Sequence, residues 1–333
     1  MFCQIWGFSY VPATQAEFRP LLKVGTTFYS DMLTCLWEDT GGGMVPVMQK
    51  QVMPNSRVVM ATRDPISRFV SAIGEVLSRV WNRKCPDGVC TKLGNAFDIV
   101  KLKSQLPRET VWYQHSEAIV QLTPGSDEYQ QALVKLVSGF VHDTTCRNHY
   151  YASEHFWTQS GLAMQHSAPE AFTGEKWDSN HTLRIFHSED TPRELFTNCQ
   201  GDGKPTTDEA RVMCESQLAT YTTFLIKLGL ATQQHGSTRV QQCIGKSNSN
   251  SATDKVVTQK YRIPTAAEIS AVLDSNDQLM TALCTFYAQD YMRFSYSFPA
   301  QCRGLETVIL AHVSPDDRPQ DVSHLLRAES YPE

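Results

Sequence analysis

A short apolar run that leads into an amphipathic helix is the feature of this 333-residue chain that most constrains its fold. Residues 57–62 (Arg-Val-Val-Met-Ala-Thr) are rich in β-branched residues, which is typical of a strand buried in a parallel sheet. Asp64 and Pro65 interrupt the run, and apolar residues then recur at helical spacing from Ile66 to Val80. A buried strand followed directly by a helix predicts an α/β fold.

The same alternation continues along the chain. Apolar spacing and capping residues predict one further clear strand, at 182–187, and helices at 27–37, 126–141, 206–228 and from the capping box Thr265–Glu268 onward. The strand expected before Lys23 is weak because it contains Pro20. Residues 82–125 look irregular, and the polar residues 233–255 predict a mobile loop. We expect a single domain over residues 1–313 and an extended tail over 314–333.

Composition excludes several classes of protein. The net charge of −5 gives no reason to expect nucleic acid as a partner. No run of about 18 apolar residues exists, so no membrane span is expected in this chain. The first 20 residues lack a signal sequence, which indicates either a soluble protein or a chain without its natural N-terminus.

The ten cysteines leave two alternatives open, ordinary thiols or disulfides. Cys85 and Cys90 flank a turn that could close a short disulfide loop. The spacing of Cys and His residues disfavours zinc, and no metal site is predicted. The single sequon, at Asn180, is relevant only if the chain is secreted.

A first candidate anion site lies before the helix at 27–37. It consists of Lys23, Val24, Gly25, Thr26 and Thr27. The N–H groups of a helix N-terminus favour a phosphate, Gly25 allows close approach of the backbone, and Lys23 adds a positive charge. The motif is not the P-loop of nucleotide kinases, because the Lys precedes the Gly. Taken alone, the motif favours the alternative of an ordinary capped helix start.

A second candidate anion site follows the strand at 57–62. Arg63 stands at the carboxyl end of that strand, where ligands of open α/β sheets bind, and Ser71 lies two helical turns further on. Both side chains could converge on one phosphate. Arg68 would add to a local concentration of positive charge there. The alternative is an Arg63–Asp64 pair and a surface serine.

Together, residues 23–27 and 63–71 resemble the two signature motifs of sulfotransferases that use 3′-phosphoadenosine 5′-phosphosulfate (PAPS). The likeness is greatest to Golgi carbohydrate sulfotransferases, including the heparan sulfate 2-O-sulfotransferase type. Residues 155–159, 183–187 and 287–294 resemble three further stretches of that group, although Thr158 replaces a proline. The resemblance implies a P-loop-like three-layer domain with a central, mostly parallel sheet flanked by helices.

The resemblance also implies roles for individual residues. The first motif, including Lys23, would hold the 5′-phosphosulfate, and Arg63 and Ser71 would hold the 3′-phosphate. Lys246, in the polar loop, would close over the nucleotide. The family implies the Golgi lumen, whereas the missing anchor favours a soluble, cytoplasmic enzyme.

Sulfuryl transfer to a hydroxyl also needs a general base. The segment between the two motifs contains no histidine, so the base that some relatives carry there has no counterpart. His155 is favoured because it lies in a family-like segment and titrates near neutral pH. The alternatives are His149, Glu38, Asp39 and Glu75. We interpret four other histidines as structural or surface residues: His181, His187, His235 and His312.

The sequence therefore predicts a PAPS-dependent sulfotransferase that acts on a hydroxyl, or an amine, of a carbohydrate or small metabolite and releases adenosine 3′,5′-bisphosphate. A glycan acceptor would need a local basic groove, which Arg79, Arg83, Lys84, Lys92, Lys101 and Lys103 could form. The alternatives are a non-catalytic nucleotide-binding protein and a P-loop-type kinase or transferase. The sequence does not indicate the acceptor or the oligomeric state.

Overall fold

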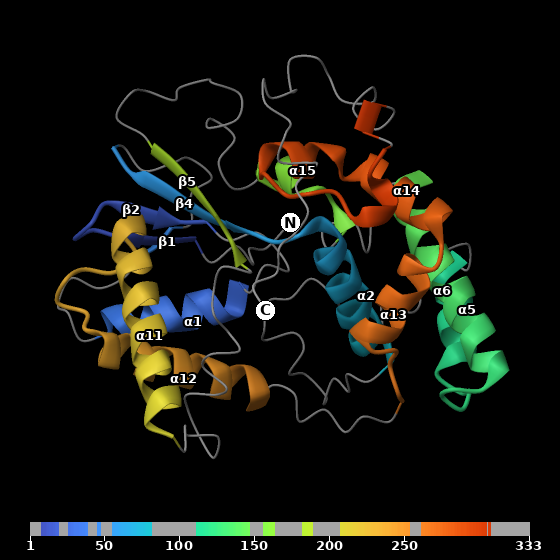
Figure 1. Cartoon of the computed structure of the whole chain (residues 1–333), viewed down its shortest axis with the longest axis horizontal. Coiled ribbons are helices and arrows are strands. Elements are labelled where there is room, and N and C mark those ends of the chain that lie inside the picture. The colour runs from blue at the N-terminus through green and yellow to red at the C-terminus, as the bar shows by residue number, and fades with distance from the viewer. Residues whose placement is uncertain are drawn as a thin grey trace. The chain divides into compact units, whose positions relative to one another are not determined.

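A computed structural model of the chain describes residues 8–19, 26–38, 45–47, 55–81, 111–146, 156–163, 182–188, 207–253, 261–304 and 306–307. These residues form a mixed α/β structure, which confirms the predicted class (Figure 1). The chain divides into two compact units. The sheet unit comprises Gln4–Arg63 and Ala163–Val256, and the helical unit comprises Met1–Cys3, Asp64–Leu162 and Val257–Glu333. The single domain over 1–313 stays a prediction, and the predicted tail lies outside the described residues.

The sheet unit contains a five-stranded mixed sheet with the order β3-β1-β2-β4-β5. The strands are β1 (Phe8–Val11), β2 (Ala16–Phe18), β3 (Val45–Val47), β4 (Arg57–Thr62) and β5 (Thr182–His187). β2, β4 and β5 run parallel, whereas β1 pairs antiparallel with both β2 and β3. The strands predicted at 57–62 and 182–187 are confirmed. The strand expected directly before Lys23, with Pro20 inside it, falls largely outside the described residues. β2 ends earlier, at Phe18, and β1 and β3 were not predicted.

Three helices pack on one side of this sheet: α1 (Thr26–Trp37), α11 (Asp208–Leu228) and α12 (Ser237–Thr253) (Figure 1). Phe186 of β5 joins two of them to the strand. Its ring meets Tyr29 of α1 edge-on, with centroids 5.4 Å apart, and Phe224 of α11 edge-on at 5.5 Å. Edge-to-face aromatic pairs are favourable beyond their buried area, so this cluster fixes α1 and α11 on the sheet.

Helix α12 corrects the prediction of a mobile loop at 233–255. Val240, Cys243 and Ile244 are fully buried and recur at helical spacing, so the polar composition hides one apolar face. Cys243 forms a disulfide with Cys35 of α1, 208 residues away in the sequence. The covalent bond and the buried face together explain why this polar stretch folds as a helix.

His235, next to α12, has a structural role, as predicted. Its Nδ1 accepts from the backbone N–H of Thr232 at 3.0 Å, and its Nε2 therefore carries the proton and donates to the Leu36 carbonyl at 3.0 Å. The ring also packs edge-on against Trp37. These contacts join the turn before α12 to the end of α1.

The described elements of the helical unit are all helices. They are α2 (Pro65–Trp81), α5 (Val111–Ile119), α6 (Asp127–Cys146), α8 (Gln159–Leu162), α13 (Ala266–Asp274), α14 (Asp277–Phe286), α15 (Ala288–Arg293) and the 3₁₀ helix η4 (Ala300–Cys302). α2 confirms its prediction, whereas α5 lies in a segment predicted to be irregular. Gly139 allows α5 and α6 to approach closely, because a Cβ there would lie 2.9 Å from the Trp112 Cα.

The C-terminal helical segment begins as predicted but is divided. The hydroxyl of Thr265 accepts from the Glu268 N–H at 3.2 Å, and the Glu268 carboxylate accepts from the Thr265 N–H at 2.8 Å. This capping box opens α13. Asn276 then caps α14 by accepting from the Leu279 N–H at 3.1 Å. Short polar side chains around Ser275 compete for backbone groups, so one expected helix becomes three.

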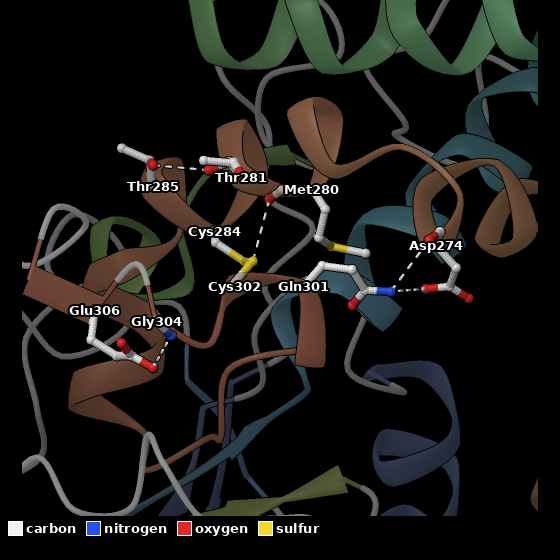
Figure 2. Close-up of a disulfide and its surroundings, with 9 residues drawn as sticks. All are labelled: Asp274, Met280, Thr281, Cys284, Thr285, Gln301, Cys302, Gly304 and Glu306. Atoms are coloured by element: carbon white, nitrogen blue, oxygen red, sulfur yellow. Dashed lines mark hydrogen bonds between the residues drawn. A yellow bond between two sulfur atoms is a disulfide. The ribbon is translucent and has the colours of Figure 1, made fainter.

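A second disulfide, Cys284–Cys302, connects α14 to η4 within the helical unit (Figure 2). Beside it, the Gln301 amide nitrogen lies 3.4 Å from both the carbonyl and a carboxylate oxygen of Asp274 (Figure 2). Cys214 of α11 is also disulfide-bonded. The disulfide alternative therefore holds for these cysteines, whereas the predicted pair Cys85–Cys90 lies outside the described residues.

Candidate functional site

Both candidate anion motifs follow adjacent parallel strands of the sheet unit. Phe18, the last residue of β2, pairs in register with Val59 of β4, so the two parallel strands run toward the same edge of the sheet and β4 continues beyond β2 to Thr62. The first motif follows β2 in the chain, and Arg63 follows β4 directly. Ligands of open α/β sheets bind beyond the carboxyl ends of parallel strands.

The first motif is described in part. Helix α1 begins at Thr26, one residue before the start predicted at Thr27, and ends at Trp37 as predicted. Lys23, Val24 and Gly25 lie outside the described residues. The helix is fixed by a buried apolar face consisting of Phe28, Met32, Leu33 and Leu36.

The second motif begins with a well-formed helix cap. Oδ1 of Asp64 accepts from the Ser67 N–H at 2.7 Å, and the Asp64 carbonyl accepts from the Arg68 N–H at 2.9 Å. Asp64 therefore serves the start of α2. Arg63 and Ser71 are both partly exposed. Their convergence on one phosphate stays a prediction, since Arg63 belongs to the sheet unit and Ser71 to the helical unit.

Arg68 corrects the expectation of an added positive charge for the anion. Its side chain is fully buried, and Nη1 donates to the carbonyl oxygen of Trp157 at 2.6 Å. The guanidinium therefore binds protein backbone in the helical unit. This burial could not be predicted from the helical apolar pattern around Arg68, which does not show where the arginine side chain binds.

Asp290 binds the same segment from helix α15. It is fully buried and accepts from the backbone N–H of Gln159 at 2.6 Å, from the N–H of Ser160 at 2.8 Å and from the Ser160 hydroxyl at 2.7 Å. Burial raises the pKa of the Asp290 carboxyl above its usual range, while these hydrogen bonds and the charge of Arg68 act in the opposite direction. The carboxylate caps α8, whose first N–H groups lack partners in the helix.

Tyr287 completes this group of contacts. Its hydroxyl donates to the Phe156 carbonyl at 2.7 Å, and burial raises its pKa well above the usual range. We call Arg68, Tyr287 and Asp290 the clamp, because all three side chains bind the backbone of residues 156–160. The clamp joins three stretches that were singled out separately in the sequence: 63–71, 155–159 and 287–294.

The candidate bases are only partly placed. His155 lies outside the described residues, directly before Phe156, and so do His149 and Asp39. Glu38 is exposed at the end of α1, and Glu75 is partly exposed on α2. The choice of base therefore stays a prediction.

Lys246 lies on helix α12 and not in a loop. The prediction that Lys246 lies in a loop is therefore wrong, and its role in closing over a nucleotide stays a prediction.

Two features of the candidate site were not found from the sequence. His187, interpreted as structural or surface, is the last residue of β5 and pairs in register with Thr62, so it reaches the edge that Arg63 also reaches. Its position at the end of a predicted strand was the available signal. The clamp is the second feature, and only the spacing of Tyr287 and Asp290 hinted at it.

Comparisons with protein-family models, with curated proteins and with solved structures found no match. Among the described helices, none combines the length and apolar character needed to cross a membrane. Within the same residues, no group of three or more His, Cys, Asp or Glu side chains is arranged to hold a metal ion.

Proposed function

We propose that this protein is a PAPS-dependent sulfotransferase that acts on a hydroxyl, or an amine, of a carbohydrate or small metabolite. One observation carries the proposal: the two motifs that resemble the PAPS signatures follow the adjacent parallel strands β2 and β4, which end at one edge of the sheet. A donor with a 5′-phosphosulfate and a 3′-phosphate needs two anion sites near each other, and two motifs that follow neighbouring parallel strands support such a pair of sites.

In this proposal, the residues of the first motif bind the 5′-phosphosulfate. The N–H groups at the start of α1, with Gly25, Thr26 and Thr27, face the phosphate oxygens. Lys23 stabilises the negative charge that develops on the bridging oxygen as the bond from sulfur to that oxygen breaks. Arg63 and Ser71 bind the 3′-phosphate through a guanidinium fork and a hydroxyl.

The transfer step balances without a metal or a redox partner. The acceptor oxygen forms a bond to sulfur, and sulfur releases the bridging oxygen of adenosine 3′,5′-bisphosphate. The acceptor proton passes to a general base, for which we propose His155. The products are a sulfate ester, the bisphosphate and the protonated base.

Thermal unfolding with two ligands tests the proposal. Adenosine 3′,5′-bisphosphate should raise the melting temperature, because a ligand at about 100 times its Kd stabilises the native state by about 2.7 kcal/mol. ATP with magnesium should raise it less. No shift with the bisphosphate would reject the proposed function, and a larger shift with ATP and magnesium would favour a kinase-type protein.

A variant of the proposed base separates binding from transfer. His155→Ala should keep the melting shift with bisphosphate and lose sulfate transfer from labelled PAPS. Retained binding without transfer by the wild-type chain, over a panel of glycans and metabolites, would favour the non-catalytic alternative.

A further inference from the structure

We propose that Tyr287 and Asp290, together with Arg68, are positioning residues that hold the backbone of residues 156–160 for the transfer step. The inference rests on the proposed function, because it concerns the segment that directly follows the proposed base His155. The proposed binding of the donor does not explain why the clamp exists. The present inference assigns the clamp a role.

The clamp binds four backbone groups within five residues. The carbonyls of Phe156 and Trp157 accept from Tyr287 and Arg68, and the N–H groups of Gln159 and Ser160 donate to Asp290. The partners are 89 to 131 residues away in the sequence. Such long-range contacts fix a short segment far more closely than its own four-residue helix α8 could.

Apolar packing already secures the segment to the helical unit. The Phe156 ring meets Phe69 of α2 edge-on, with centroids 5.4 Å apart, and lies 5.5 Å from the Phe140 ring of α6. A buried carboxylate and a buried guanidinium are costly to remove from water, and apolar side chains of similar size often stabilise a fold as well or better. Anchoring alone therefore does not require these charges, whereas orientation of the backbone does.

The orientation of Phe156 affects its neighbour directly. One peptide bond joins His155 to Phe156, and consecutive Cα atoms across a trans peptide are about 3.8 Å apart. In this proposal, a change in the backbone at Phe156, the first residue that the clamp binds, is therefore transmitted to His155 through the chain. General-base catalysis depends on hydrogen-bond reach, so a small displacement lowers the rate without removing the base.

Tyr287→Phe tests this role, with Tyr129→Phe as the matched control. Tyr129 is also buried in the helical unit, and its hydroxyl donates to the Glu268 carboxylate at 3.1 Å, so it makes no contact with the clamped segment that the structure records. Each variant removes one buried hydroxyl. Both proteins are compared with the wild type by urea unfolding, by titration with adenosine 3′,5′-bisphosphate and by turnover of PAPS with water as the acceptor.

We expect Tyr287→Phe to lower kcat for PAPS turnover about tenfold or more and to change the bisphosphate Kd less than about twofold, since a tenfold loss of rate needs only a small misplacement. Tyr129→Phe should keep both values within about twofold. Asp290→Asn, which keeps the size of the side chain, should lower kcat in the same way.

Three results are distinguishable. If the wild-type chain binds no bisphosphate, the proposed function itself fails, and this inference with it. If the wild type binds and turns over PAPS while Tyr287→Phe keeps its full kcat, only the positioning role fails. The positioning role also fails if both tyrosine variants lose kcat equally, because the loss of rate would then reflect only the loss of a buried hydroxyl's contribution to stability.

Discussion

At the scale of single residues, hydrogen bonds and an opposite charge set the ionisation of a carboxyl. Glu268, which is partly exposed in the first turn of α13, is a clear case. Burial raises the pKa of its carboxyl, but hydrogen bonds from Thr265 and Tyr129 and the positive charge of Arg262 outweigh burial, so the pKa is lowered overall. A carboxyl with a lowered pKa stabilises the native state above its ordinary pKa of 4.5 and loses this contribution as the pH falls.

Glu268→Gln should therefore cost more stability at pH 7 than at pH 3. The ionised carboxylate of the wild type accepts hydrogen bonds from Thr265 and Tyr129 and pairs with Arg262 at 3.0 Å. At low pH the wild type loses these charge-dependent contributions, and the two proteins become more alike. Urea unfolding of both at the two pH values measures the difference, and an equal cost at both would contradict the assignment.

The same scale explains what the sequence hid about the candidate site. The residue types of both candidate anion motifs are readable along the chain, because each motif is short and local. The clamp is not, because Arg68, Tyr287 and Asp290 act through partners 89 to 131 residues away. The prediction that Arg68 adds positive charge at the anion site was wrong for this reason. Helix periodicity does not distinguish an arginine that binds an anion from one that binds a backbone carbonyl.

At the scale of secondary-structure elements, two glycines in helix interiors lead to opposite predictions. Replacing glycine by alanine within a helix gains about 1 kcal/mol from propensity. A Cβ at Gly74 of α2 meets nothing within 4 Å, so that gain should be realised. A Cβ at Gly139 of α6 would lie 2.9 Å from backbone atoms of Trp112, and overpacking against backbone costs about 1–3 kcal/mol.

We therefore expect Gly74→Ala to stabilise the protein and Gly139→Ala to destabilise it. Chemical unfolding of the two variants beside the wild type provides the measurement. A stabilised Gly139→Ala variant would show that α5 and α6 do not pack as closely as the structure shows.

Elements with strong local signals could be predicted, and those that depend on distant partners could not. The predictions of β4, α2, β5 and α11 are confirmed, since each carries its own apolar pattern. Helix α12 was missed because three buried residues and a disulfide to Cys35 outweigh a polar composition. β1 and β3 are only four and three residues long, and their pairing with neighbouring strands, not their own pattern, defines them.

At the scale of the whole molecule, the structure identifies disulfides where the sequence alone left free thiols and disulfides as alternatives. Cys35–Cys243 lies within the sheet unit and Cys284–Cys302 within the helical unit, so each unit has its own crosslink. Native disulfides typically contribute about 2–5 kcal/mol and are typical of proteins that fold in oxidising compartments.

In the proposed function, Arg63 recognises a 3′-phosphate, and Arg57 of the same strand β4 is a matched control for it. Arg63 follows the carboxyl end of the strand, while Arg57 begins it at the opposite end, and both side chains are partly exposed. Hydrogen bonds to charged groups contribute about 1.5–3 kcal/mol, and each 1.4 kcal/mol corresponds to about a tenfold change in affinity.

Calorimetric titration of three proteins, the wild type, Arg63→Ala and Arg57→Ala, with adenosine 3′,5′-bisphosphate and with adenosine 5′-monophosphate tests this claim most directly. The wild type and Arg57→Ala should prefer the bisphosphate by about tenfold or more, and Arg63→Ala should lose most of that preference. A wild type that binds both nucleotides equally, or an Arg57→Ala variant that loses the preference as fully as Arg63→Ala, would contradict it.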